Sequence, residues 1–98
     1  MKVEYADKRL AKIKTDEAHK LGLPIAVITA ARKKIHYLEQ VPDELTLRNL
    51  RSLQYKKLKG EKEGRRSIRV NDQYRIEFTL DNDEHPPVIR ITEIGDTH

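Results

Sequence analysis

The 98-residue chain contains no cysteine and no tryptophan, one phenylalanine and only four glycines. Without cysteine, disulfides, thiolate metal sites and cysteine catalysis are excluded, and the absence fits a cytoplasmic protein. No stretch approaches the ~18 apolar residues of a membrane span, and the N-terminus lacks the apolar run of a signal peptide. The sequence also has no glycine-rich phosphate loop and no pair of histidines at metal-ligand spacing. We therefore expect a soluble cytoplasmic protein without a membrane partner.

Basic residues outnumber acidic ones, with 20 Lys and Arg against 16 Asp and Glu and a net charge of +4. Such a surface favours an anionic partner: a nucleic acid, an anionic membrane or an acidic protein. The length suits a single domain with one core, which we place over residues 1–98. The apolar residues fall into periodic blocks, which argues against disorder.

The spacing of apolar residues predicts an α+β fold. We expect a short edge strand over residues 2–5, a helix over about 7–21 that is broken or shortened near Thr15, and a second helix over 24–40. The second helix carries an apolar stripe at three- and four-residue steps, formed by Ile28, Ala31, Ile35 and Leu38. Residues 43–52 are either a helical turn or a connector. The period then changes to two and predicts strands over 53–59, 66–70, 74–80 and 88–94, so two N-terminal helices should cover one face of an antiparallel sheet of about four strands.

The hydrophobic pattern also sets the register of the two clearest strands. A three-residue connection over 71–73 pairs Arg69 with Arg75 and keeps the apolar residues of both strands on one face. The two arginines then lie side by side on the face away from the helices. Like charges placed opposite each other destabilise a sheet, whereas a bound phosphate would turn their repulsion into joint attraction. The alternative is a solvated lattice of salt bridges in which Glu77 or Glu93 neutralises the pair.

The chain ends on "GDTH" directly after its last predicted strand, so Asp96 and His98 are expected close to the sheet. An imidazole exchanges protons near neutral pH and is a candidate acid or base. The other three histidines have no comparable context: His19 and His36 lie on predicted helix surfaces and His85 lies in a turn.

The segment "LKGEKEGRRSIRVNDQYRIEF" over residues 58–78, followed by a strand and a terminal Asp-x-His, resembles the HigB branch of the RelE/ParE toxin superfamily. The likeness is strongest over residues 53–98. It implies a small RelE-like, microbial-ribonuclease-like α+β domain that acts as the toxin of a type II toxin–antitoxin pair. It further implies a ribosome-dependent mRNA endoribonuclease that uses no metal or other cofactor. The implied partners are a HigA-like helix-turn-helix antitoxin, the ribosome and mRNA, with operator DNA bound only through the antitoxin.

The resemblance also implies roles for individual residues. Arg69 and Arg75 would bind the phosphate with added charge from Lys59, and His98 would transfer protons with Asp96 orienting it. The catalytic candidates are thus His98, Asp96, Arg69, Arg75, Lys59 and Lys56, and the candidates for RNA binding are Arg65, Arg66, Lys57 and Thr97.

Two positions depart from the family pattern. Thr97 replaces a tyrosine, and Lys56 stands where many relatives have histidine. A catalytically weak or inactive member that binds RNA or the ribosome is therefore an alternative, as is a gyrase-targeting toxin of the ParE branch, although the terminal Asp-x-His argues against the latter. The remaining alternative is a basic scaffold domain without a nucleic-acid target.

Overall fold

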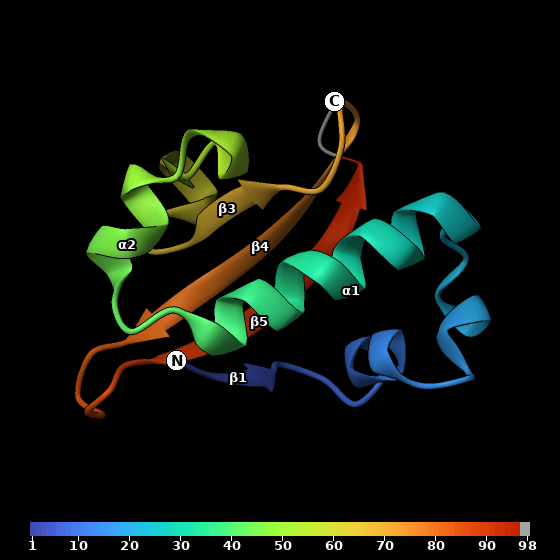
Figure 1. Cartoon of the computed structure of the whole chain (residues 1–98), viewed down its shortest axis with the longest axis horizontal. Coiled ribbons are helices and arrows are strands. Elements are labelled where there is room, and N and C mark those ends of the chain that lie inside the picture. Colours follow the sequence, from blue (N-terminus) through green and yellow to red (C-terminus); the bar gives the residue numbers. More distant parts are fainter. Residues whose placement is uncertain (97–98) are drawn as a thin grey trace.

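The computed structural model describes residues 1–96 and confirms the predicted α+β fold class, with helices packed on one face of a sheet (Figure 1). In chain order the elements are β1 (Lys2–Tyr5), η1 (Leu10–Lys14), η2 (Ala18–Leu21), α1 (Ile25–Gln40), α2 (Glu44–Asn49), η3 (Arg51–Leu53), β2 (Lys56–Lys57), η4 (Gly60–Lys62), β3 (Arg66–Arg69), β4 (Tyr74–Asp81) and β5 (Val88–Asp96), where η marks a 3₁₀ helix. None of the helices in residues 1–96 is long and apolar enough to cross a membrane.

The sheet has five strands in the order β1-β5-β4-β3-β2. The last four strands form the predicted antiparallel meander, and β1 adds a parallel edge strand beside β5. The strand predicted over 53–59 is shorter than expected, because only Lys56 and Lys57 join the ladder with β3. The 3₁₀ helix η3, which ends at Leu53, takes up the start of that range.

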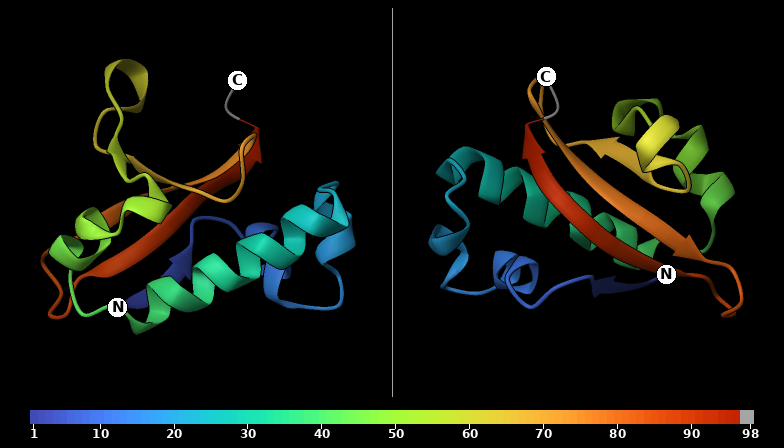
Figure 2. Two further views of the ribbon diagram at one scale, coloured as in Figure 1. Left: turned by 45° about the horizontal axis from the view of Figure 1, so that its top comes forward. Right: turned by 180° about the vertical axis from the view of Figure 1, so that it is seen from behind.

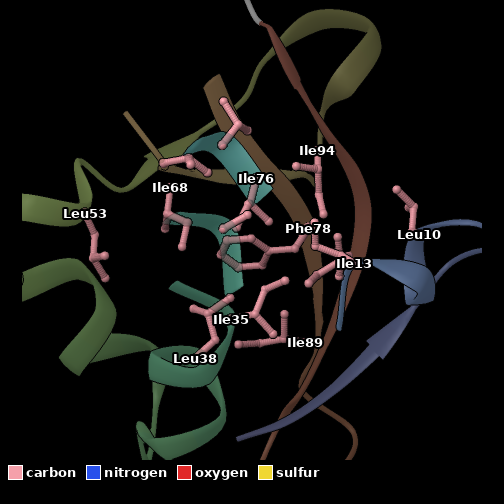
Figure 3. Packing of buried hydrophobic residues seen from close by; sticks show 14 of the residues in the cluster. Leu10, Ile13, Ile35, Leu38, Leu53, Ile68, Ile76, Phe78, Ile89 and Ile94 are labelled. Carbon is pink, nitrogen blue, oxygen red and sulfur yellow. The ribbon is translucent and has the colours of Figure 1, made fainter. Parts of the chain in front are cut away.

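The core lies between α1 and the sheet, as predicted from the apolar stripe of the helix. All four stripe residues are buried in one cluster with Ile68, Ile76, Phe78 and Ile89 of the strands, and Figure 3 shows Ile35 and Leu38 beside Phe78 and Ile89. Phe78 also meets the ring of Tyr55 edge-on, with ring centroids 6.4 Å apart. Because this packing turns one side of every strand inward, the residues between the core positions project from the other face of the sheet.

The segment before α1 forms two 3₁₀ helices instead of one α-helix, and the break falls at Thr15, where the sequence suggested it. Thr15 is extended, and its hydroxyl donates to the carbonyl of Lys12 and accepts from the N–H of Glu17. Arg32 of α1 donates to the carbonyls of Ile13 and Thr15 at 2.6 and 2.7 Å. A side chain from α1 thus satisfies carbonyls that a continuous helix would have used itself.

Seen from behind, β4 and β5 lie in front of α1, so the helix leaves this face of the sheet uncovered (Figure 2, right). The segment that carries η4 crosses part of this face, where Lys62 reaches Glu77 of β4 at 2.9 Å. The open face is therefore divided between a region near the β3–β4 turn and a region under η4.

Candidate functional site

Arg69 of β3 and Arg75 of β4 are cross-strand partners, which confirms the register predicted from the hydrophobic pattern. The connection spans residues 71–73, and the N–H of Val70 donates to the carbonyl of Tyr74 at 2.9 Å. The neighbouring residues Ile68 and Ile76 are fully buried on the helix side. Both guanidinium groups therefore project from the face that α1 leaves uncovered.

Arg75 is held in place by neighbours from two other segments. Its Nε donates to Ser67 Oγ at 2.9 Å, and one terminal nitrogen donates to the carbonyl of Gln54. Gln54 has a left-handed backbone, with φ of 47°, at the end of η3. This conformation is uncommon for a residue other than glycine. Ser67 and Gln54 together fix the orientation of Arg75 on the sheet.

The charge on Arg75 is only partly compensated. Burial lowers the pKa of its guanidinium, repulsion from Arg69 lowers it further, and Glu77 acts in the opposite direction. Arg69 forms an ion pair with Asp72, while no carboxylate of residues 1–96 lies within ion-pair distance of Arg75. The expected alternative, in which Glu77 or Glu93 neutralises the arginines, does not occur as a direct contact, because both acids bind Lys62 instead.

The arginine pair lines a hollow with a volume of about 450 Å³, which we call the concave surface. Its other described lining residues come from the β3–β4 turn and from the segment after η3. They are Gln54, Lys56, Asn71, Asp72 and Gln73. Three cations and three amide side chains form a surface suited to an anion with several acceptor oxygens, such as a phosphodiester.

The three lysine candidates separate in the structure. Lys56 pairs with Ser67, so it shares the face of the arginine pair and lines the same concave surface. Lys57, the next residue, pairs with Arg66 and projects to the opposite side. Lys59 is exposed at the start of η4 and does not line that surface. Only Lys56 joins Arg69 and Arg75.

The neighbouring arginines Arg65 and Arg66 also lie apart from the pair. Arg66 Nε donates to Glu44 Oε2 at 3.1 Å and to the Tyr55 hydroxyl at 3.0 Å, on the helix side of the sheet. Arg65 lies 3.6 Å from Glu77 Oε1, under η4. Consecutive side chains along a strand point to opposite faces, so Arg66 faces the helices, whereas Arg65 shares the face of the pair but lies farther along the sheet, beside Glu77.

Asp96 lies at the end of β5, opposite Tyr74 and next to the turn that carries Asn71 and Gln73. Its Oδ2 accepts a hydrogen bond from Gln73 Nε2 at 2.7 Å. Gln73 lines the concave surface, so Asp96 lies one hydrogen bond away from a residue of the surface that holds the arginine pair. Thr97 and His98, the other two candidates at this end of the chain, lie outside the described residues.

Sequence reasoning missed several residues of this site. Ser67 and Gln54 anchor Arg75, and Asn71 accepts from the N–H groups of Gln73 and Tyr74, which fixes the turn. The "NDQ" sequence was a detectable turn signal, since Asn side chains commonly bond the backbone two or three residues on. Ser67 was detectable as a polar residue facing Arg75 in the predicted register. Nothing in the sequence indicated the left-handed backbone of Gln54.

Within residues 1–96, no group of three or more His, Asp or Glu side chains is arranged to hold a metal ion.

Comparison with known proteins adds evidence from sequence and from fold. No curated protein matches the sequence significantly. Several solved structures share the fold over nearly the whole chain. The YoeB/ParE toxin from Agrobacterium tumefaciens superposes with a TM-score of 0.60 and 14% identity, covering 100% of both chains. The YoeB–YefM complex from Staphylococcus aureus gives 0.62 and 15%, covering 100% of this chain and 98% of the other.

The E. coli DinJ–YafQ toxin–antitoxin complex gives a TM-score of 0.58 and 19% identity, covering 96% of this chain and 89% of the other. At such identities these structures establish a common fold. The sequence itself matches, over residues 3–88, the family described as the RelE-like toxin of type II toxin–antitoxin system HigB. That match spans most of the chain, including both strands of the arginine pair, and the chain belongs to the HigB-like family of RelE-type toxins.

Proposed function

We propose that this toxin is a ribosome-dependent mRNA endoribonuclease that acts in the cytoplasm and blocks translation without a metal cofactor. The observation that carries the proposal is the cross-strand pair of Arg69 and Arg75 on an open, concave surface, with one of the two guanidinium groups free of a direct carboxylate partner among residues 1–96. Two aligned guanidinium groups beside Lys56 match the charge of a phosphodiester and of the transition state derived from it.

The proposed reaction is an internal transfer at phosphorus. The ribose 2′-oxygen loses its proton and attacks the adjacent phosphorus, the bond to the 5′-oxygen breaks, and the 5′-oxygen takes up a proton. The products are a 2′,3′-cyclic phosphate and a free 5′-hydroxyl. Arg69, Arg75 and Lys56 stabilise the additional negative charge that develops on the phosphoryl oxygens, since fixed cations contribute most where charge develops.

The proton transfers are proposed for the end of the chain. His98 is the candidate acid or base because imidazole titrates near neutral pH, and Asp96 lies two residues before it in sequence and is hydrogen-bonded to Gln73 of the concave surface. Lys59 and the RNA-binding candidates Arg65, Arg66, Lys57 and Thr97 remain proposals from the family resemblance. Of these, Lys57 and Arg66 project from the face opposite the arginine pair.

An antitoxin is the proposed protein partner, of the HigA-like helix-turn-helix type that would also bind operator DNA. Two structures with the same fold are complexes: YoeB–YefM from S. aureus, and DinJ–YafQ from E. coli, which is a toxin–antitoxin complex. The ribosome and mRNA are the proposed targets of the free toxin.

The test compares Arg75→Ala with Arg90→Ala in a reconstituted translation reaction that contains ribosomes and a defined mRNA. Arg90 is a matched control because it lies on the same sheet, is exposed, pairs only with Glu4 within residues 1–96, and does not line the concave surface. We expect cleavage by the wild type and by Arg90→Ala, and a loss of at least about a hundredfold for Arg75→Ala. An uncut message with the wild-type toxin on translating ribosomes would overturn the proposal.

A second candidate is a toxin that occupies RNA or the ribosome without cutting it. It is favoured by the described lining of the concave surface, which holds cations, amides and Asp72 but none of the histidines His19, His36 and His85. In that case Arg75→Ala would weaken ribosome binding while His98→Ala would leave growth inhibition intact. A supercoiling assay with purified gyrase separates both candidates from a ParE-like toxin.

A further inference from the structure

Glu77 is a buried carboxylate that the proposed reaction does not use. Its side chain is 3% exposed, and it lies on β4 two residues after Arg75, on the same face and opposite Ser67. Its Oε1 has no hydrogen-bond partner among the residues that the structure describes. A carboxylate in such a place is unfavourable unless neighbouring cations compensate it, so the identity of those cations indicates what the residue does.

Two cations reach Glu77 from the same short segment. Lys62 Nζ lies 2.9 Å from Oε2, and a terminal nitrogen of Arg65 lies 3.6 Å from Oε1. The hydrogen bond to Glu77 raises the pKa of Lys62. Glu93, which faces Glu77 across the β4–β5 ladder, binds Lys62 as well at 3.4 Å, but its side chain is 51% exposed.

Both cations belong to residues 58–65, a segment that we call the strap. It contains η4, which buries no residue, and its two glycines Gly60 and Gly64 have positive φ values of 71° and 90°. Its own backbone bonds are few: the N–H of Leu58 donates to the carbonyl of Arg65 at 2.9 Å, the N–H of Glu63 to that of Gly60 at 3.0 Å, and the N–H of Arg65 to that of Lys62 at 3.0 Å. With so little buried surface, the strap depends on its side-chain contacts with the sheet.

The strap continues directly from β2, which is only two residues long and carries Lys56. Lys56 and Arg75 line the concave surface at the arginine pair. They also line a second concave surface, which encloses a volume of about 270 Å³, under the strap. The second surface is completed by Leu58, Lys62, Ser67 and Glu77. The position of Lys56 relative to Arg75 is thus linked to the position of the strap.

We infer that Glu77 is a positioning residue, which anchors the strap to the sheet through Lys62 and Arg65 and so keeps Lys56 beside Arg75. The anchoring role stands on the contacts alone, and only its consequence for RNA rests on the proposed function. Glu93 supports Lys62 from the solvent side but does not replace the buried carboxylate, since Arg65 makes no contact with it within residues 1–96.

The first experiment measures amide hydrogen exchange in Glu77→Gln and, as a matched control, in Glu93→Gln. Both changes remove one charge next to Lys62 and keep the side-chain shape. We expect the Leu58 amide to exchange about tenfold faster in Glu77→Gln, because a charge-assisted contact that closes the strap is lost. The same amide should keep its wild-type rate in Glu93→Gln. Equal rates in all three proteins would overturn the inference.

A second variant guards against misfolding of Glu77→Gln. Lys62 is half exposed and lies outside the strands, so Lys62→Met changes no residue of the sheet while it removes the strap's closest contact with Glu77. We expect the Leu58 amide to exchange faster in this variant too. Wild-type protection of Leu58 in Lys62→Met would contradict the anchoring role.

The second experiment measures binding of a short oligouridylate at several salt concentrations. A purely electrostatic role for Glu77 predicts tighter binding by Glu77→Gln, because a negative charge is removed near the arginines. The positioning role predicts weaker binding and a salt slope shallower by about 0.7, the loss of one phosphate contact to single-stranded nucleic acid. Tighter binding with an unchanged slope would exclude the positioning role. Failure of the wild type to bind would count against the proposed RNA site, whereas the exchange comparison decides the anchoring role by itself.

Discussion

Ser67 Oγ accepts a hydrogen bond from Arg75 Nε at 2.9 Å. Ser67 lies on β3, the strand next to the one that carries Arg75. Ser67 is 1% exposed, so water does not readily replace the contact. Nε is the guanidinium nitrogen bonded to Cδ of the arginine side chain. A hydrogen bond at Nε therefore sets the direction in which the two terminal nitrogens point. This buried hydroxyl, together with the carbonyl of Gln54, thus orients the half-buried cation of the pair.

The first prediction concerns Ser67→Ala. The orientation of Arg75 should be lost while its charge remains, so mRNA cleavage on ribosomes should fall about tenfold, with the free energy of unfolding lowered by about 1 kcal/mol. Ser52→Ala, at an exposed serine, is the control. Cleavage at the wild-type rate by a folded Ser67→Ala protein would show that Arg75 needs no support from β3.

The second prediction separates Arg66 from the arginine pair. Arg66→Met removes the bonds to Glu44 and Tyr55, where both charged side chains are less than one quarter exposed. We expect the free energy of unfolding to drop by about 2 kcal/mol, measured by chemical denaturation, with RNA affinity of the folded protein unchanged. Arg51→Met, at an exposed arginine of η3, should change neither quantity. A selective loss of RNA affinity in Arg66→Met would instead place Arg66 in the binding surface.

The contrast between Arg66 and Arg69 shows what the sequence can and cannot predict. The register of β3 and β4 followed from the alternation of Ile68, Val70, Ile76 and Phe78, because a slip by one residue would expose all of them. The core stripe of α1 followed from its helical spacing in the same way. In both cases several residues at a regular spacing indicate the same structure, so the prediction does not depend on any single residue.

The features that sequence reasoning missed are single events without a repeat. The left-handed backbone of Gln54 is set by how η3 meets β2, and the burial of Glu77 depends on where the strap folds. That Arg66 lies on the helix side follows from its alternation with Ile68, but its partners Glu44 and Tyr55 belong to segments whose positions the sequence did not predict. Interactions between segments distant in sequence determined each of these.

The third prediction concerns Tyr5, whose hydroxyl is buried and has no hydrogen-bond partner within residues 1–96. Tyr5→Phe removes an unpaired polar group and keeps the ring. We expect the free energy of unfolding to rise by about 1 kcal/mol, because the desolvation cost of the hydroxyl disappears. Tyr37→Phe, at a half-buried tyrosine of α1, is the comparison. A clear loss of stability in Tyr5→Phe would reveal a partner for the hydroxyl.

The fourth prediction is a loss of stability in alkaline solution. Burial, reinforced by Glu39, raises the pKa of Tyr5 to about 12, and burial with the hydrogen bond to Glu44 raises the pKa of Tyr55 to about 12. Between the ordinary tyrosine pKa of about 10 and these values, the folded protein binds more protons than the unfolded chain. Stability therefore decreases as pH rises through this window.

The measurement is chemical denaturation at a series of pH values, for the wild type and for the double variant Tyr5→Phe/Tyr55→Phe. The variant should show a smaller decrease above pH 10, since lysines and any other groups titrate in both proteins. Parallel curves for the two proteins would mean that neither phenol is protected by the fold.

The pairing of β5 with β4 contains one irregularity, a β-bulge at Thr92, and this bulge affects how the length of the strand can change in evolution. The pairing moves from Glu77 opposite Glu93 to Phe78 opposite Ile91, so Thr92 is an extra residue, and its hydroxyl donates to the carbonyl of Glu77 at 3.2 Å. This bulge allows both Ile91 and Ile94 to face the core, and it brings Gly95 opposite Arg75. A β-carbon added at Gly95 would meet open space.

Because Thr92 is the extra residue, its deletion would remove the bulge and restore strict alternation, with Glu93 still opposite Glu77 and Ile94 still facing the core. In a stretch of strand without a bulge, the loss of one residue would instead exchange the two faces of everything that follows. The bulge therefore lets this end of β5 lose one residue in evolution without moving Gly95 from its place opposite Arg75.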